Sequence, residues 1–144
     1  PTIFFTCSPS AAAKVAADIV IAPEVGPEVI TGSTRMKAGT ATKLVLNMIS
    51  TGAMVKLGKT FGNLMVDLQP TNAKLRDRTE RIFSALTGVD TKVASRQLAA
   101  AGGQLKIAIV MELCAVDRAR AQDLLDTHDG IVKRAVGAHS GSSL

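Results

Sequence analysis

The chain has 144 residues, of which 47% are hydrophobic, so it is long and apolar enough to form one small domain, alone or with an appendage. Its net charge is +5, spread over both halves without a dense basic run. Aromatic residues make up only 3%, with no Tyr and no Trp, which argues against a surface that stacks nucleic-acid bases. We therefore expect an anionic small molecule, and not nucleic acid, as the partner.

The first elements predicted along the chain form a strand–helix–strand unit. Residues 2–7 and 18–22 are short apolar runs typical of buried strands, and residues 10–17 between them are predicted to form a helix. Strands that are apolar on both faces and joined by a helix usually pair in parallel. Because the first strand has no residues leading into it, we expect the chain to begin inside a domain.

The most informative stretch, residues 26–43, follows the second strand. Glycine and proline break its first part, and its second part begins a long helix predicted over 35–58, with its start between residues 33 and 38. A hydroxyl of Ser33 or Thr34 can cap this helix. Hydroxyls, cations and free N–H groups at a helix N-terminus suit an anion such as a phosphate ester. The candidate binding residues are Ser33, Thr34, Arg35, Lys37 and Lys43.

From these residues alone, a well-capped helix with a solvated basic first turn is an equal alternative to an anion site. For Lys43 the alternative is a structural ion pair. Further along the same helix, Thr40, Lys43, Asn47 and Ser50 form a line of mostly small polar side chains. This line is either a solvated face or the lining of a cleft or subunit contact.

The remaining elements are predicted to be mainly helical. Residues 60–68 form a connecting segment, and a charged helix follows over 71–86. Residues 90–137 form a separate helical unit with a weak internal repeat, in which each copy reads helix, glycine break, helix at an offset of 27 residues. Residues 139–144 are rich in Ser and Gly, so we expect them to be frayed.

Cysteine use and hydropathy bound the environment of the chain. Cys7 and Cys114 lie far apart in apolar surroundings, which favours free thiols over a disulfide and fits a cytosolic location. No Cys-x-x-Cys or His/Cys cluster suggests a metal site. No signal peptide and no apolar run of membrane-spanning length is present in the sequence, so we expect no membrane partner.

Residues 26–43 resemble the signature shared by N-acetylmuramic acid 6-phosphate etherases and glucokinase regulatory proteins. The shared pattern is Gly-Pro-Glu, an apolar pair, Gly-Ser-Thr-Arg-Met-Lys, Gly-Thr and a final Lys, and this sequence fills every one of those positions. So long a match is far more specific than a single glycine motif. The similarity continues through residues 44–58 and 62–67 into the C-terminal helices, and the etherases are the closer match.

The resemblance implies an α/β fold. Residues 1–88 would be the second half of a sugar isomerase (SIS) parallel-sheet domain, and residues 89–144 a small α-helical tail similar to ubiquitin-associated domains. The implied activity is that of a lyase in cell-wall sugar recycling, which cleaves the D-lactyl ether of N-acetylmuramic acid 6-phosphate to N-acetylglucosamine 6-phosphate and D-lactate. The resemblance also implies a cytoplasmic homodimer with the site near the subunit contact, and no metal or other cofactor.

In this family the acid and the base are thought to be two glutamates upstream of the part matched here, and the serine-rich loop that binds the phosphate also lies there. We therefore expect residues 1–144 alone to be inactive. Glu28 stands where related sugar-phosphate isomerases carry an acidic residue beside the sugar. It is a candidate to contact sugar hydroxyls or to relay a proton. The alternative is a carboxylate bonded to nearby backbone or to Arg35.

Two other functions stay open at this point. A regulatory protein of the glucokinase-regulator type would share the signature and sense sugar phosphates, and its catalytic acids need not be intact. A basic helical DNA-binding or adaptor module is the third possibility, against which the scarcity of aromatic residues weighs.

Overall fold

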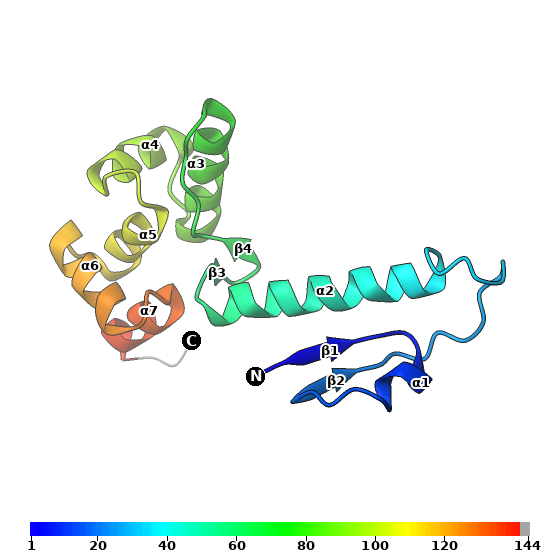
Figure 1. Cartoon of the computed structure of the whole chain (residues 1–144). Helices are drawn as coiled ribbons and strands as arrows, with labels where there is room; N and C mark the ends of the chain where they lie inside the picture. Colours follow the sequence, from blue (N-terminus) through cyan, green and yellow to red (C-terminus); the bar gives the residue numbers. More distant parts are fainter. Residues whose placement is uncertain (142–144) are drawn as a thin grey trace. The chain divides into compact units, whose positions relative to one another are not determined.

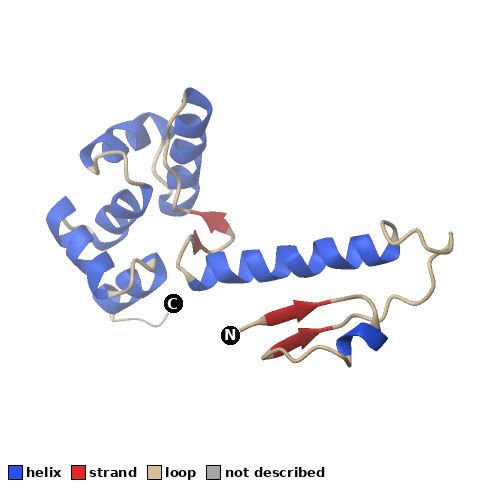
Figure 2. Cartoon of the chain, in the orientation of Figure 1, coloured by secondary structure: helices blue, strands red, loops and turns tan. Residues whose placement is uncertain are grey.

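The computed structural model describes residues 1–141 and contains two compact units, which divide between Ala53 and Met54 (Figure 1). We call residues 1–53 unit 1 and the part that begins at Met54 unit 2. Over residues 1–141 the fold is mixed α/β, with a small parallel sheet, a short hairpin and seven helices (Figure 2). The predicted boundary between residues 88 and 89, which separates the sugar isomerase part from the helical tail, is a different division and stays a prediction.

Unit 1 holds a two-stranded parallel sheet and most of a long helix. Its elements are β1 (Ile3–Phe5), α1 (Pro9–Ala12), β2 (Ile19–Ile21) and α2 (Lys37–Lys56), whose last turn passes into unit 2. In the sheet Ile3 lies opposite Ile19 and Phe5 opposite Ile21, which confirms the predicted parallel pairing. The start of α2 at Lys37 also falls within the predicted range.

Helix α1 is much shorter than the helix predicted over 10–17. From Lys14 on the backbone bonds span three residues instead of four: the N–H of Lys14 donates to the carbonyl of Ala11 (3.1 Å) and that of Val15 to the carbonyl of Ala12 (3.5 Å). A single helical turn carries the full cost of nucleation, and no side chain of α1 is buried to offset that cost. The alanine-rich run therefore ends as turns.

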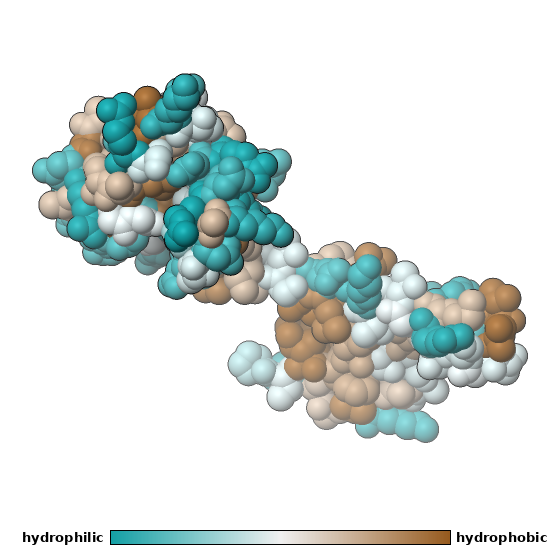
Figure 3. Space-filling view, turned by 90° about the horizontal axis from the view of Figure 1, so that it is seen from above, coloured by the Kyte–Doolittle hydropathy of each residue, from teal (hydrophilic) through white to brown (hydrophobic). Residues whose placement is uncertain are grey.

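Unit 1 buries very little. Val45 is its one buried hydrophobic side chain, whereas Ile3, Ile19 and Val20 in the strands are 54%, 49% and 42% exposed. The expectation of strands buried on both faces is thus not met by residues 1–53 themselves. In Figure 3 the brown, hydrophobic surface gathers over this unit.

Unit 2 begins with a hairpin that the sequence did not predict. Strands β3 (Thr60–Phe61) and β4 (Leu64–Met65) pair antiparallel within the expected connecting segment. Helix α3 (Ala73–Thr87) follows, close to the predicted range of 71–86. It starts at Asn72, whose side chain accepts a hydrogen bond from the N–H of Leu75 at 2.9 Å, and it ends at Gly88 in the left-handed conformation.

Within its described residues the tail has four helices in two matching pairs. They are α4 (Thr91–Ala100), α5 (Leu105–Cys114), α6 (Arg118–Thr127) and α7 (Val132–Ser140). Adding 27 to the bounds of α4 gives those of α6, and the caps Asp90 and Asp117 are related by the same offset. The internal repeat is confirmed as a repeat of structure.

The end of α7 corrects one expectation. His139 and Ser140 are helical instead of frayed, because the helix continues to Gly141, which caps it in the left-handed conformation. Residues 142–144, also expected to be frayed, lie outside the described residues.

The hydrophobic core of the described chain lies in unit 2. The largest fully buried apolar side chains come from the hairpin's end and from helices α3, α5 and α7: Val66, Phe83, Leu105, Ile107, Ile109, Val110 and Val132. Helix α5 packs against α3, α4, α6 and α7, so it is the centre of this unit. Its near-continuous apolar sequence is that of a helix buried on most sides.

Candidate functional site

Residues 27–38 form a loop that is closed at its base, and we call it the signature loop. The Glu28 carboxylate accepts hydrogen bonds from the N–H of Lys37 at 2.9 Å and from the N–H of Ala38 at 3.0 Å. The Lys37 ammonium also spans the base of the loop and donates to the Pro27 carbonyl at 3.1 Å. These three bonds form the neck of the loop.

The neck fixes the charge state of Glu28. The N–H groups of Ala38 and then of Lys37 hold the pKa of this carboxyl below its usual value, because both bonds favour the ionised form. Glu28 is therefore ionised at neutral pH. Its contacts are those of a carboxylate bonded to nearby backbone, and a role toward a sugar stays a prediction.

The first turn of α2 is fully satisfied within the chain. Four backbone N–H groups at the start of a helix lack an internal partner, and here Glu28 binds the first two. The N–H of Gly39 donates to the Thr34 carbonyl at 2.8 Å, and the N–H of Thr40 donates to the Met36 carbonyl at 2.9 Å. In this conformation the helix start offers no free N–H to a phosphate.

The prediction that a Ser33 or Thr34 hydroxyl caps α2 is wrong. The helix begins only at Lys37, and residues 30–36 turn on their own backbone bonds, such as the one from the Met36 N–H to the Ser33 carbonyl at 3.2 Å. The two hydroxyls thus precede the helix by a full turn. Glu28, nine residues before Lys37, provides the cap instead.

Two of the five predicted binding residues, Arg35 and Lys37, line one open depression of about 640 Å³ in unit 1. Its lining residues are Val25, Arg35, Met36, Lys37, Thr40, Ala41 and Leu44. Ser33, Thr34 and Lys43 are not among them. The lining combines two cations with apolar side chains, which suits an anion attached to a less polar body.

Lys43 and its polar neighbours are all exposed. Lys43 forms no ion pair with residues 1–141, so the alternative of a structural ion pair finds no support there. The hydroxyl of Thr40 donates to the Met36 carbonyl at 2.8 Å, and that of Ser50 to the Asn47 carbonyl at 3.2 Å. Both hydroxyls are thus bonded to backbone carbonyls three or four residues earlier, that of Ser50 within α2 and that of Thr40 just before it.

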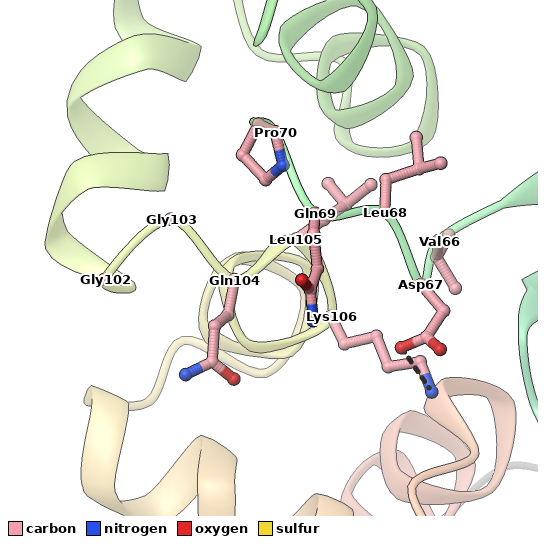
Figure 4. Close-up of a pocket in the computed structure, with 10 residues that line it drawn as sticks. All are labelled: Val66, Asp67, Leu68, Gln69, Pro70, Gly102, Gly103, Gln104, Leu105 and Lys106. Atoms are coloured by element: carbon pink, nitrogen blue, oxygen red, sulfur yellow. Dashed lines mark ion pairs between the residues drawn. The ribbon is translucent and has the colours of Figure 1, made fainter. Parts of the chain in front are cut away.

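Unit 2 contains a second cavity, of about 510 Å³, between residues 66–70 and the start of α5 (Figure 4). At one end of it the Asp67 carboxylate pairs with the Lys106 ammonium at 3.5 Å and with Lys59. Lys106 also donates to the Gly130 carbonyl at 3.0 Å. A hydrogen bond from Lys59, followed by the charge of Lys106, holds the pKa of Asp67 below its usual range.

This charge cluster was not predicted from the sequence. Its members are separated by up to 47 positions in the sequence, so only the fold brings them together. The one available signal was that Asp67 and Lys106 each interrupt an apolar run, which in a packed region requires a partner.

No group of three or more His, Cys, Asp or Glu side chains within residues 1–141 is arranged to hold a metal ion. Cys7 and Cys114 are both free thiols, as predicted, and burial raises the pKa of Cys114. No helix in the described range is both long enough and apolar enough to cross a membrane.

Comparisons with known proteins give a consistent result. No protein-family model matches the chain. It is 50% identical over 133 residues to the N-acetylmuramic acid 6-phosphate etherase of Photobacterium profundum, a match of 92% of this chain and 44% of that protein. Etherases of the same name from Serratia proteamaculans and Clostridium botulinum are 48% identical over 136 residues and 49% identical over 135 residues.

Each of those two matches covers 94% of this chain, and they cover 46% and 45% of the relatives. The chain thus spans less than half the length of the curated relatives that it matches. These identities confirm the resemblance carried by the signature: over nine tenths of its length, the chain is similar to N-acetylmuramic acid 6-phosphate etherases.

Proposed function

We propose that the full-length protein is a carbon–oxygen lyase that cleaves the D-lactyl ether of N-acetylmuramic acid 6-phosphate. The products are N-acetylglucosamine 6-phosphate and D-lactate. The observation that carries this proposal is the 48–50% identity to proteins named as etherases over more than nine tenths of the chain. The relatives reported above all carry that name, which favours the enzyme over a sugar-phosphate-sensing regulator.

The reaction needs a base, an acid and a binding site for the phosphorylated sugar. The ring-opened sugar has an aldehyde that acidifies the C2 proton; a base removes this proton, an acid assists the departure of lactate from C3, and water then adds. We assign the acid and the base to the part of the full-length protein that precedes this chain. The present chain contributes the signature loop, with Arg35 as a planar guanidinium suited to a phosphate or carboxylate.

We also propose the domain types and the assembly that the family resemblance implies. Unit 1 would complete a sugar isomerase sheet, and the four-helix tail would be similar to ubiquitin-associated domains. Support for a larger assembly comes from the apolar side chains that unit 1 leaves exposed, including Leu44 and Met48 at 54% and 64%. We further propose a cytoplasmic homodimer, with the line of Thr40, Lys43 and Asn47 near the subunit contact.

The test is release of D-lactate from N-acetylmuramic acid 6-phosphate by purified full-length protein. We expect turnover by the full-length protein and none by residues 1–144 alone. A correctly folded full-length protein that binds the sugar phosphate without releasing lactate would support the regulator and overturn the enzyme.

The site assignment has its own test in the same assay. Arg35→Ala should weaken binding of the phosphorylated sugar by about 10- to 100-fold, the value of one charge-assisted hydrogen bond. Lys56→Ala is the matched control, because it removes an exposed cation from the last turn of α2, far along the helix from the signature loop. Equal kinetic constants for the two variants would remove Arg35 from the site. Ser33→Ala, Thr34→Ala and Lys43→Ala, at residues that do not line the depression, should have smaller effects.

A further inference from the structure

The two cations that line the depression differ in what they bond to. The Lys37 ammonium is engaged with the Pro27 carbonyl at 3.1 Å, as part of the neck. Arg35 is exposed and forms no ion pair with any residue in the range 1–141. We propose that Glu28 and Lys37 are positioning residues that hold Arg35 toward the phosphorylated sugar, and that Arg35 makes the contact. This inference rests on the proposed function.

The first support is the geometry of the neck. Both oxygens of Glu28 are used, one on each of two consecutive N–H groups, at 2.9 and 3.0 Å. A carboxylate that bridges two amides in this way fixes the chain on both sides of the loop. The Lys37 ammonium spans the same gap by donating to the Pro27 carbonyl, so three charge-assisted bonds join residues 27 and 28 to residues 37 and 38.

The second support is the position of Arg35 inside the closed loop. Two backbone hydrogen bonds close turns that contain Arg35: the N–H of Met36 donates to the Ser33 carbonyl (3.2 Å), and the N–H of Gly39 donates to the Thr34 carbonyl (2.8 Å). Its backbone is therefore tied to the first turn of α2, which Glu28 caps. If the neck opens, residues 29–36 regain their freedom, and the sugar phosphate must order them again on binding.

The third support is that both carboxylate oxygens of Glu28 already accept a hydrogen bond from the backbone at the start of α2. The bonds to Ala38 and Lys37 keep it ionised, so it enters the reaction with no proton to donate. As a base it would be weak, because the bonds from Ala38 and Lys37 stabilise its ionised form and oppose uptake of a proton. A positioning role needs no proton transfer.

The experiment is a double-mutant cycle in the full-length protein, with Glu28→Gln, Arg35→Ala and both together. Gln keeps one oxygen acceptor but turns an NH₂ group toward an N–H donor, so one side of the neck is lost. We expect Glu28→Gln alone to raise KM by about 10-fold, with kcat and its pH profile nearly unchanged. In the Arg35→Ala background the same change should have less than a ~2-fold effect, because the group that it positions is gone.

The matched control is Glu24→Gln, which removes an exposed carboxylate that forms no side-chain hydrogen bond within residues 1–141. It should leave both kinetic constants unchanged. Lys37→Ala should resemble Glu28→Gln, and the two together should be less than additive, since they open one neck. Amide hydrogen exchange at residues 37 and 38 should accelerate in Glu28→Gln and not in Glu24→Gln.

Several results would overturn the positioning role. A loss of kcat by ~10²–10⁴ in Glu28→Gln, with a lost limb in the pH profile, would make Glu28 an acid or base. Additive KM effects of Glu28→Gln and Arg35→Ala would mean that Glu28 does not act through Arg35. If Glu28→Gln lowers only Tm and leaves both kinetic constants unchanged, then Glu28 stabilises the loop and has no role in binding. Absence of lactate release by the wild-type protein would instead overturn the proposed function, and the assignment of Arg35 with it.

Discussion

Units 1 and 2 are similar in apolar content but differ in what they bury. Within its described residues unit 2 packs apolar side chains into a core of 18 buried residues, whereas unit 1 buries Val45. In unit 2 the helices supply covering surfaces to one another, with α5 in contact with four of them. In unit 1 a two-stranded parallel sheet and one long helix leave apolar faces on both elements. The difference teaches that apolar sequence builds a core only where a second layer is available.

The small parallel sheet explains why we expect unit 1 to be the less stable of the two units. Parallel sheets are covered on both faces in folded proteins, and two strands alone are at best marginal. The exposed strand residues of unit 1 are the kind found in such covered sheets. We therefore expect stability in this chain to come almost entirely from unit 2.

The largest expected effect comes from separating the units. A polypeptide of residues 54–144 should keep a cooperative thermal unfolding transition, because it retains the whole core. Residues 1–53 alone should show none. Circular dichroism at 222 nm during heating measures both. A cooperative transition in the 1–53 polypeptide, or its absence in 54–144, would contradict the comparison.

A single core substitution should reproduce part of that contrast. Phe83 is fully buried in α3, so Phe83→Ala should lower the free energy of unfolding by about 3–5 kcal/mol. The matched substitution in unit 1 is Met48→Ala, at a side chain that is 64% exposed in α2, and it should cost less than about 0.5 kcal/mol in the 144-residue chain. Urea unfolding of the two variants decides the matter. Similar losses in both would mean that unit 1 contributes a core of its own.

Local patterns predicted the helices of unit 2 well because those helices have local signals. Asn72 and Gly88 mark the ends of α3, and the glycine breaks at 102–103 and 130 follow the ends of α4 and α6. The hairpin β3–β4 was missed because its strands have only two residues each, too few to show a period. Helix α1 was overestimated because alanine favours a helix only where packing extends it beyond one turn.

The sequence predicted which residues belong to the candidate site, but not the hydrogen bonds that close the signature loop. The signature located Arg35 and Lys37, which do line one depression. The sequence could not reveal that Glu28 reaches across nine residues to cap α2, since hydroxyls nearer to the helix appeared to be the natural caps. Caps formed at long separation depend on how the loop folds, and that is a tertiary property.

The next prediction tests how closely the parts of unit 2 pack. Gly58 has a φ of +66° and lies against Ile131, where an added Cβ would approach a side-chain carbon to 2.6 Å. Gly58→Ala should therefore cost at least about 2 kcal/mol, from backbone strain and overpacking together. Gly62→Ala is the matched control, because its φ is +58° and nothing lies within 4 Å of the added atom.

The control should cost only the strain, about 1–2 kcal/mol. Urea midpoints and slopes for both variants give the difference. If the two substitutions cost the same, then the contact between Gly58 and Ile131 is loose in solution and the start of unit 2 is less firmly packed than the core.

The smallest effect concerns the charge cluster of Asp67, Lys59 and Lys106. The folded state lowers the pKa of Asp67, first through the hydrogen bond from Lys59, so the ionised carboxylate stabilises the fold. That contribution is fully present above the unfolded pKa, near 3.8, and is lost as the pH falls through the lower, folded pKa. Because a third of the Asp67 side chain is exposed, solvent screening keeps the contribution below about 1 kcal/mol.

Asp67→Asn should therefore lower the free energy of unfolding at pH 7 by up to about 1 kcal/mol, and the gap from the wild type should close as the pH is lowered below 4. The matched control is Asp77→Asn, which removes an exposed carboxylate paired with Arg81 one turn along α3, and it should cost about 0.3 kcal/mol or less at pH 7. Urea unfolding at a series of pH values measures both. A gap for Asp67→Asn that stays constant down to the folded pKa and below would mean that the side chain acts through shape and hydrogen bonding. The cluster would then join residues 59–67 to α5 without its charge, and the contrast between the two units would rest on apolar packing alone.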